Sequence, residues 1–105
     1  METFKFEFET PSDASVSQAA VLVGVVGSGN AEVLIEPNVE KNKCHVHVNT
    51  SASGFGETWK RVISDFVKRN ALGGIDVYVN DGGASPAVIS LRLDQAAAEY
   101  KGGQS

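Results

Sequence analysis

The sequence predicts an α+β fold: a single two-layer domain in which a mostly antiparallel or mixed β-sheet of about five strands carries two α-helices on one face. Five short segments are extended in character, because apolar residues alternate with polar ones or run continuously. One later segment repeats apolar residues at helical spacing, and another opens with a capping serine and a proline. The elements follow the order ββββαβα. A chain of 105 residues has the length of one domain.

The first two predicted strands are separated by a surface loop. Residues 4–8 (FKFEF) place three phenylalanines on one side and charged residues on the other, which is typical of a half-buried strand. Residues 10–18 are rich in turn-forming residues and are expected to form the loop. Residues 19–26 (AAVLVGVV) are continuously apolar and β-branched, which predicts a central strand buried on both faces.

Two further strands follow the Gly-Ser-Gly-Asn break. Residues 32–37 (EVLIEP) are extended and stop at Pro37, which has no N–H to offer a sheet. After a polar turn, residues 44–50 (CHVHVNT) alternate again. Their cysteine and valines share one face, while His45 and His47 share the other.

The remaining elements are a helix, a strand and a second helix. An apolar stripe predicts a helix that ends at Asn70 and the following Gly73-Gly74 pair; the stripe consists of Trp59, Val62, Ile63, Phe66 and Val67. Residues 75–81 alternate as a strand. Ser85-Pro86 resembles an N-cap followed by proline in the first helical turn, so the second helix is expected over about 86–99. Each helix has one apolar face to bury, which favours packing both on the sheet.

Composition and charge exclude several classes of protein. The net charge of −4 argues against a nucleic-acid partner, since such proteins concentrate lysine and arginine. One cysteine permits no internal disulfide, which fits a reducing compartment. The longest apolar run is far shorter than the roughly 20 residues needed to span a bilayer, and the N-terminus lacks the pattern of a signal peptide. We therefore expect a cytoplasmic protein without a membrane partner. Residues 1–105 are expected to form one domain, with residues 1–2 and 101–105 as frayed ends.

The glycine-rich segment GVVGSG fits none of the usual catalytic or phosphate-binding motifs. Its spacing is G-x-x-G-x-G, and a strand follows it, so no helix N-terminus is placed to bind a pyrophosphate. It lacks the Lys-Ser/Thr of a P-loop and the G-x-S-x-G spacing of a nucleophile elbow. A serine nucleophile also needs a base, and nothing in the sequence brings His45 or His47 to Ser28. Independent serine hydrolysis therefore ranks last among the hypotheses.

The histidines and the cysteine have simple structural explanations. His45 and His47 share a strand face and could both reach a metal, but the chain offers no second pair of histidines or cysteines to complete a site. Two exposed histidines on a half-buried sheet are the favoured interpretation, and no metal is expected. Cys44 and Trp59 are expected to be core residues.

The segment YVNDGGASP, residues 78–86, has a structural and a functional interpretation. All its residues fit a connection from a strand to a helix. Alternatively, Asp81 could orient a group bound at the helix N-terminus, where free N–H groups and the dipole favour anions. Asp81 is therefore a candidate docking or loop residue.

Ser28 presents the main question, because it stands between Gly27 and Gly29 directly after an apolar strand. The glycines allow positive φ and let a partner approach closely, so an unactivated serine held there would suit modification by a separate transferase. Gly27, Gly29 and Asn30 would then support an attachment turn. Gly-Ser-Gly-Asn is equally a good hairpin turn. The residues alone support both interpretations equally.

Three motifs give the chain its resemblance to a known family. They are LVGVVGSGNAEVLIEP at 22–37, VNTSASGFGETW at 48–59 and VNDGGASPAVISLRLDQA at 79–96. In this order and spacing they resemble the acyl carrier protein (delta) subunit of malonate decarboxylase. The acyl carrier (gamma) subunit of citrate lyase is a more distant relative, and a carrier of that type is an alternative.

The resemblance implies a prosthetic group and a set of partners. In that family the serine matching Ser28 bears 2'-(5''-phosphoribosyl)-3'-dephospho-CoA, joined through a phosphodiester. The thiol of this arm carries acetyl and malonyl groups as thioesters to acyltransferase and decarboxylase subunits, and a prosthetic-group transferase attaches the arm. The carrier itself is then not an enzyme. A chain made without the transferase is expected to lack the arm.

This sequence departs from the family pattern at two positions, and one rival hypothesis stays open. The family usually has an acidic residue where this chain has Asn30, and often an aromatic residue where it has Gly83. Asparagine keeps the turn propensity of aspartate but loses its charge, which predicts slower modification if the transferase reads that charge. The rival hypothesis is an unmodified scaffold or regulatory subunit of an enzyme complex, in which Ser28 is only a turn residue.

Overall fold

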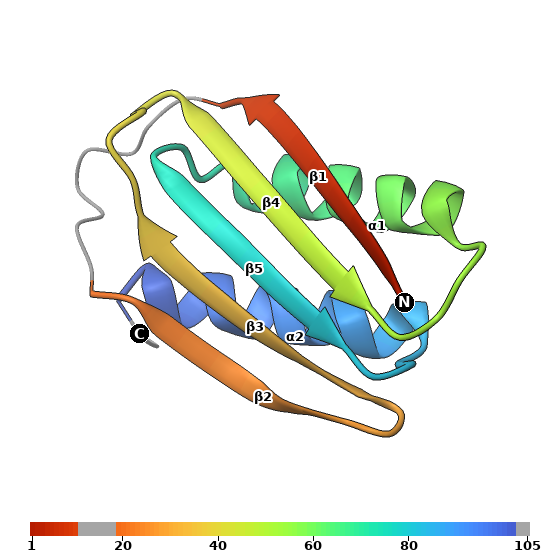
Figure 1. The fold of residues 1–105 in the computed structure, drawn as a ribbon. Coiled ribbons are helices and arrows are strands. Elements are labelled where there is room, and N and C mark those ends of the chain that lie inside the picture. The colour runs from red at the N-terminus through yellow and green to blue at the C-terminus, as the bar shows by residue number, and fades with distance from the viewer. Residues whose placement is uncertain (11–18, 103–105) are drawn as a thin grey trace.

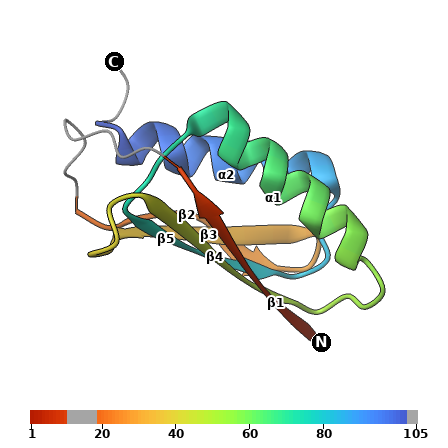
Figure 2. The same cartoon turned by 90° about the horizontal axis from the view of Figure 1, so that it is seen from above.

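The structure is a five-stranded sheet with two helices on one face, as the sequence predicts (Figures 1 and 2). This computed structural model describes residues 1–10 and 19–102. The strand order across the sheet is β1-β4-β5-β3-β2. The elements are β1 (Glu2–Glu9), β2 (Val21–Gly27), β3 (Asn30–Pro37), β4 (Lys43–Thr50), α1 (Gly56–Asn70), β5 (Ile75–Asp81) and α2 (Pro86–Tyr100).

The sheet is mixed because one connection is a helical crossover. Strands β4 and β5 are parallel neighbours, and α1 runs between them in the chain. Parallel neighbours need such a crossover, whereas antiparallel strands can be joined by a tight turn. The other three pairs, β1–β4, β2–β3 and β3–β5, are antiparallel. Helix α2 follows β5 back across the same face, so both helices lie on one side of the sheet (Figure 2).

The core lies between this sheet face and the two helices. Strands β3, β4 and β5 bury every second residue, as alternation predicts. The predicted stripe of α1 is buried as well. Helix α2 contributes Ile89, Leu93, Ala96, Ala97 and Tyr100 and is helical from Pro86 to Tyr100, one residue beyond the predicted end.

The prediction that residues 19–26 form a central strand was wrong. Strand β2 lies at the edge of the sheet and pairs only with β3 among the described strands. Leu22, Val25 and Val26 are more than half exposed. A bulge between Gly24 and Gly27 places Val25 and Val26 opposite a single residue of β3, and both of these valines are exposed. A continuous apolar run cannot reveal such a bulge or an edge position, because both depend on the partner strand.

The C-terminus of α1 differs in detail from its prediction. The helix ends at Asn70 as expected, but the residue that turns the chain out of the helix is Ala71, with φ 47° and ψ 48°. Its N–H donates to the carbonyl of Val67. Left-handed conformation is unfavourable for alanine because its Cβ crowds the backbone. The cap therefore carries local strain that a glycine would relieve.

Replacing Ala71 with glycine is expected to stabilise the fold by about 1 kcal/mol. The change removes a left-handed penalty of about 1–2 kcal/mol and costs about 0.5–1 kcal/mol of chain entropy. Ala98→Gly is a matched control inside α2, where the same substitution is expected to destabilise by about 1 kcal/mol. Thermal or urea unfolding measures both. A lower stability of A71G would contradict the expectation.

The loop predicted at residues 10–18 falls mostly outside the described part of the chain. Thr10 is described, and its N–H donates to the carbonyl of Asn42 at 2.8 Å. Residues 11–18 and 103–105 are outside the described ranges. At the ends, β1 begins at Glu2, which pairs with Thr50, and residues 101–102 form a turn after α2.

Candidate functional site

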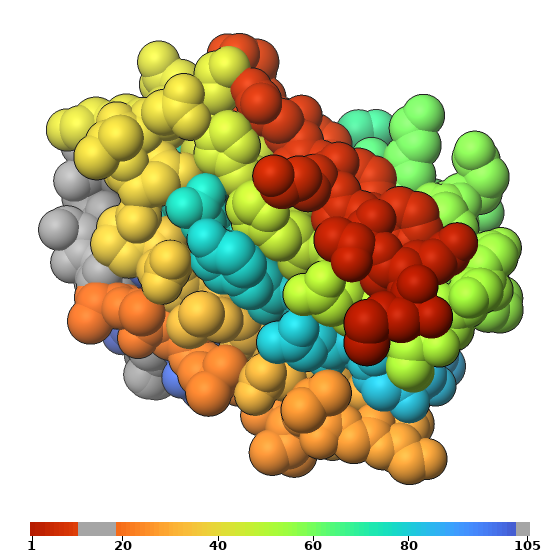
Figure 3. All heavy atoms as spheres, in the orientation of Figure 1, coloured from red at the N-terminus to blue at the C-terminus, as the bar shows by residue number. Residues whose placement is uncertain are grey.

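Ser28 lies at the exposed tip of the hairpin that joins β2 and β3. Gly27 and Asn30 form the last strand pair, so Ser28 and Gly29 make a two-residue turn. Gly29 has a φ of +72° while Ser28 does not have a positive φ, which is the sign pattern of a type II turn. Figure 3 shows the tip of this hairpin, in light orange, projecting from the lower edge of the molecule. Ser28 is accordingly exposed to solvent.

The two glycines beside Ser28 leave open space around it. A Cβ atom added at Gly27 or at Gly29 would meet no other residue within 4 Å. Gly29 needs to be glycine because of its φ, but Gly27 has no positive φ. The backbone therefore gives no reason for a glycine at position 27. A side chain at position 27 would point into open space beside the serine.

The loop that follows β5 holds the turn in place. The N–H of Gly29 donates to the carbonyl of Gly82 at 3.1 Å, and the N–H of Gly82 donates to the carbonyl of Asn30 at 2.9 Å. The backbones approach so closely that a Cβ atom at Gly82 would lie 2.0 Å from the carbonyl oxygen of Gly27. Gly82 is thus a supporting residue that the sequence interpretation missed, since nothing local shows that positions 27 and 82 meet.

Asp81 is the last residue of β5, directly before this loop, and it is buried. It is 6% exposed. One carboxylate oxygen accepts a hydrogen bond from the Thr50 hydroxyl, and the other accepts from the N–H of Ala84, both at 2.8 Å. The side chain therefore ties the ends of β4 and β5 to the residues that open α2. The structure brings this predicted residue close to the Ser28 turn through Gly82.

Asn30 connects the turn to α2. Its Oδ1 accepts from the N–H of Ala31 at 2.8 Å and from Nε of Arg92 at 3.2 Å. Arg92 was not recognised in the sequence, because its 62-residue separation from Asn30 hides the contact. The asparagine side chain thus connects the strand residue that follows the turn to α2.

A pocket of about 270 Å³ opens next to this loop. It lies between the N-terminal ends of α1 and α2, and Gly83 and Ala84 form part of its wall. Trp59 was expected to be a core residue, and it is only 3% exposed. It also lines the pocket, together with Phe55, Thr58, Asp81 and Ile89.

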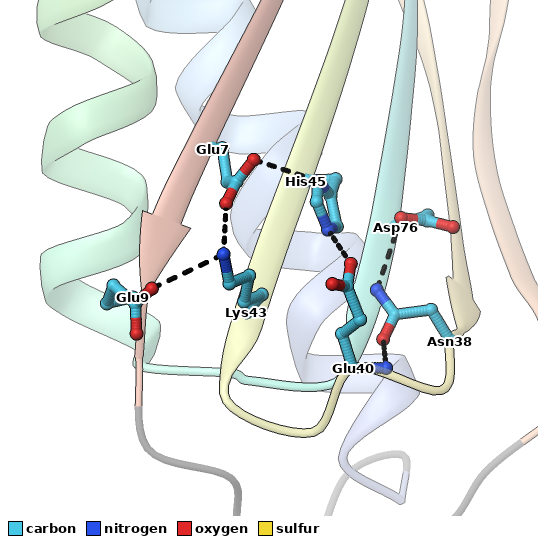
Figure 4. A network of polar contacts seen from close by, with 7 residues as sticks. All are labelled: Glu7, Glu9, Asn38, Glu40, Lys43, His45 and Asp76. Atoms are coloured by element: carbon cyan, nitrogen blue, oxygen red, sulfur yellow. Dashed lines mark hydrogen bonds and ion pairs between the residues drawn. The ribbon is translucent and has the colours of Figure 1, made fainter.

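The two histidines lie away from the Ser28 turn. His45 belongs to a polar network at the opposite end of the sheet, where its Nε2 lies 2.6 Å from Oε1 of Glu40 (Figure 4). His47 stacks on Tyr78, with ring centroids 4.7 Å apart. Among the described residues, no three histidine, cysteine or acidic side chains gather as metal ligands would. Neither histidine is placed to act as a base for Ser28.

Cys44 is 1% exposed, and it faces the core as predicted. Burial raises the pKa of its thiol to about 12, with a smaller contribution from the negative charge of Asp76. Thiolates, not thiols, are the reactive form. This cysteine is therefore expected to be inert in the folded protein.

The folded chain without an arm is accordingly expected to react very slowly with Ellman's reagent at pH 8, and rapidly in denaturant. A pKa near 12 leaves a thiolate fraction of about one in ten thousand at that pH. Above pH 9 the unfolded chain loses this proton first, so the free energy of unfolding should fall as the pH rises towards 12. Urea titrations at pH 8 and 10 measure the loss. Rapid labelling of the native chain would contradict the expectation.

Comparison with known proteins identifies the family. The family model described as "Malonate decarboxylase delta subunit (MdcD)" matches residues 18–100. The chain belongs to this family. It is thereby one of the acyl carrier proteins of malonate decarboxylase, as the resemblance predicts. The match covers the Ser28 turn, the loop around Gly82 and both helices.

Relatives of this carrier family cover almost the whole chain. A malonate decarboxylase acyl carrier protein of Burkholderia cepacia is 52% identical over 99 residues, which are 94% of this chain and 90% of that protein. One from Stenotrophomonas maltophilia (strain K279a) is 48% identical over 91% of both chains. A chain of a Pseudomonas malonate decarboxylase hetero-tetramer, solved in complex with malonate, is 34% identical with a TM-score of 0.84, covering 95% of this chain and 99% of that one. Separately, none of the helices in the described ranges is long and apolar enough to cross a membrane.

Proposed function

We propose that this carrier holds acetyl and malonyl groups as thioesters on a phosphoribosyl-dephospho-CoA arm attached to Ser28. The attachment is a phosphodiester made by a separate prosthetic-group transferase. When bound, the arm supplies the thiol on which these thioesters form. Acyltransferase and decarboxylase subunits perform the chemistry in the cytoplasm, and the carrier is not itself an enzyme. Its task is to keep the thioester at high effective concentration near each active site.

The exposed position of Ser28 on a fixed turn is the observation that carries this proposal. A hydroxyl is the group from which a phosphodiester can be made, and the open space beside Gly27 and Gly29 leaves room for the arm and for a transferase active site. The hydrogen bonds to Gly82 hold the turn against the sheet. The chain thus offers an attachment point with a defined position and an unhindered approach.

The surroundings of Ser28 favour modification by another protein over catalysis by this one. Nucleophilic serines need a base within hydrogen-bond reach and a third group to orient it. His45 lies at the far end of the sheet in the network of Figure 4, and His47 is stacked on Tyr78. The transferase therefore has to bring its own base for the Ser28 proton.

The partners follow from the same proposal. The structural neighbour belongs to a hetero-tetramer, which supports a carrier that works inside a complex of several subunits. We expect acyltransferase and decarboxylase subunits to meet the carrier at the end of the sheet where Ser28 projects. No nucleic acid, membrane or metal ion takes part.

The test is the intact mass of the chain after co-expression with the transferase and the enzyme that makes its precursor. We expect one added CoA-like arm, mapped to the peptide that contains Ser28. Ser28→Ala should stay unmodified, while Ser53→Ala, a change at another exposed loop serine, should be modified like the wild type. An unmodified wild-type mass, beside a control carrier modified in the same cells, would overturn the proposal. It would leave the scaffold or regulatory hypothesis in its place.

A further inference from the structure

The pocket between the two helix N-termini lies at the same end of the molecule as Ser28. The starts of α1 and α2, the end of β5 and the β2–β3 turn all gather at this end of the sheet (Figure 1). Trp59 and Ile89 form buried parts of the pocket wall, while Phe55 and Pro86 line it from exposed positions. The pocket is thus open to solvent on one side, and most of the side chains that line it are apolar, with Thr58 and Asp81 as the polar ones.

One short loop connects the pocket to the attachment turn. Gly82 makes two hydrogen bonds to the turn around Ser28, and the next two residues, Gly83 and Ala84, line the pocket. A group tethered at Ser28 by a flexible CoA-like arm would therefore search a small volume that includes the pocket. Tethering of this kind gives effective concentrations in the millimolar range, so even weak binding leads to occupancy.

We propose that this pocket receives the acetyl thioester end of the arm and leaves the malonyl thioester outside. The inference rests on the proposed attachment at Ser28. A pocket of about 270 Å³ is near the lower limit of about 300 Å³ for small-molecule sites, a size that suits a short acyl thioester and not a whole cofactor. An acetyl thioester carries no charge and has a single polar oxygen, that of its carbonyl, so its methyl group and sulfur match the walls made by Trp59, Val62 and Ile89.

The selectivity against malonyl follows from charge. The malonyl group carries a carboxylate, and an unpaired charge in an apolar pocket is strongly disfavoured because it loses its water. Asp81 is one of the residues that line the pocket, and its two carboxylate oxygens already accept hydrogen bonds from Thr50 and Ala84, so a malonyl carboxylate placed there would meet a like charge and find no donor. Among the residues that the structure describes, no lysine or arginine lines this pocket.

The consequence is that the acetyl form of the carrier is protected from hydrolysis. Water that attacks the acetyl carbonyl breaks the carbon–sulfur bond, which releases acetate and returns the proton to the thiol of the arm. An acetyl group inside the pocket is shielded from this attack, whereas a malonyl group stays accessible. Shielding for four-fifths of the time would slow hydrolysis about five-fold.

The experiment measures thioester hydrolysis on the isolated carrier with its arm attached at Ser28. Release of the arm thiol is followed with Ellman's reagent, to which the buried Cys44 is not expected to respond. Acetyl-CoA and malonyl-CoA serve as unshielded references. We expect the acetyl carrier to hydrolyse about five-fold more slowly than acetyl-CoA, and the malonyl carrier to match malonyl-CoA. A carbon-13 label in the acetyl methyl group should also show a nuclear Overhauser effect to the ring of Trp59.

Variants that fill the pocket provide the second part of the test. Ala84→Leu places a larger side chain in the wall and is expected to restore the hydrolysis rate of acetyl-CoA and to remove the signal to Trp59. Ala87→Leu, at an exposed position of α2 outside the pocket lining, should leave the protection intact. Ala52→Leu fills the same pocket from the other loop and replaces A84L if that variant does not fold by circular dichroism.

The outcomes separate this inference from the proposed function. If no arm can be attached to Ser28, both are overturned. If the arm is attached but the acetyl carrier hydrolyses as fast as acetyl-CoA without a contact to Trp59, the pocket inference alone fails. If the malonyl thioester is protected from hydrolysis as well as the acetyl thioester, the proposed selectivity is overturned. If the acetyl thioester stays protected in both A84L and A52L, it is not this pocket that shields it.

Discussion

Replacing Ser28 with alanine is expected to reduce turnover of the assembled decarboxylase to the level of a complex without carrier. The hydroxyl oxygen is the atom that the proposed phosphodiester needs, and alanine has no atom that could replace it. The fold should persist, because an exposed turn residue changes stability by no more than about 0.5 kcal/mol. The expected variant is therefore folded, able to join the complex and inactive.

The measurement combines turnover with two checks on the variant. Circular dichroism and thermal unfolding report the fold, and size-exclusion chromatography reports assembly with the partner subunits. Ser53→Ala, which changes an exposed serine outside the turn, is the matched control and should retain full turnover. Addition of modified wild-type carrier should restore activity to the S28A preparation. Substantial turnover by S28A alone would show that acyl groups travel by another route.

Replacing Gly82 with alanine is expected to have the largest effect on the fold near the site. The added Cβ atom would lie 2.0 Å from the carbonyl oxygen of Gly27 and 2.7 Å from its carbonyl carbon. Both contacts are with backbone, which cannot move aside as a flexible side chain can. We expect a loss of about 3 kcal/mol, the upper end of the range for overpacking. The hydrogen bond from Gly29 to Gly82 should weaken as the turn is pushed away.

Gly27→Ala provides a matched control from the other side of the same contact. Its Cβ atom would point into open space, so stability should stay within about 0.5 kcal/mol of the wild type. Urea unfolding measures both variants, and amide NMR shifts of Ser28 and Gly29 report displacement of the turn. A stable G82A protein with unchanged shifts would contradict the expectation. If G27A is stable but modified more slowly, Gly27 is present for the transferase and not for the fold.

The sequence was most informative where a residue pattern repeats over a whole element. Alternation in residues 44–50 and 75–81 predicted the buried faces of β4 and β5, because side chains of a strand point to opposite sides in turn. The Ser85-Pro86 start of α2 was predicted correctly, and the Ser85 hydroxyl does accept from the N–H of Val88. These features depend on neighbours within one turn or one strand, so a local pattern suffices.

The candidate site was only partly predictable. Ser28, its glycines and Asn30 could be singled out because turn chemistry is local. The contact between Gly82 and Gly27 and the bond from Arg92 to Asn30 join residues that are more than 50 positions apart. The edge position of β2 was missed for the same reason, since a valine-rich strand can have the same residue pattern at the centre and at the edge of a sheet.

The sequence alone determined the types and order of the elements, the turn that carries Ser28 and, through family resemblance, the acyl carrier role. Only the tertiary structure decided that the β5–α2 loop holds this turn and that an apolar pocket lies one residue further along the loop. The reason is physical. Backbone and capping preferences act between near neighbours, whereas the position of Gly82 against Gly27 follows from how strands pair across the whole sheet.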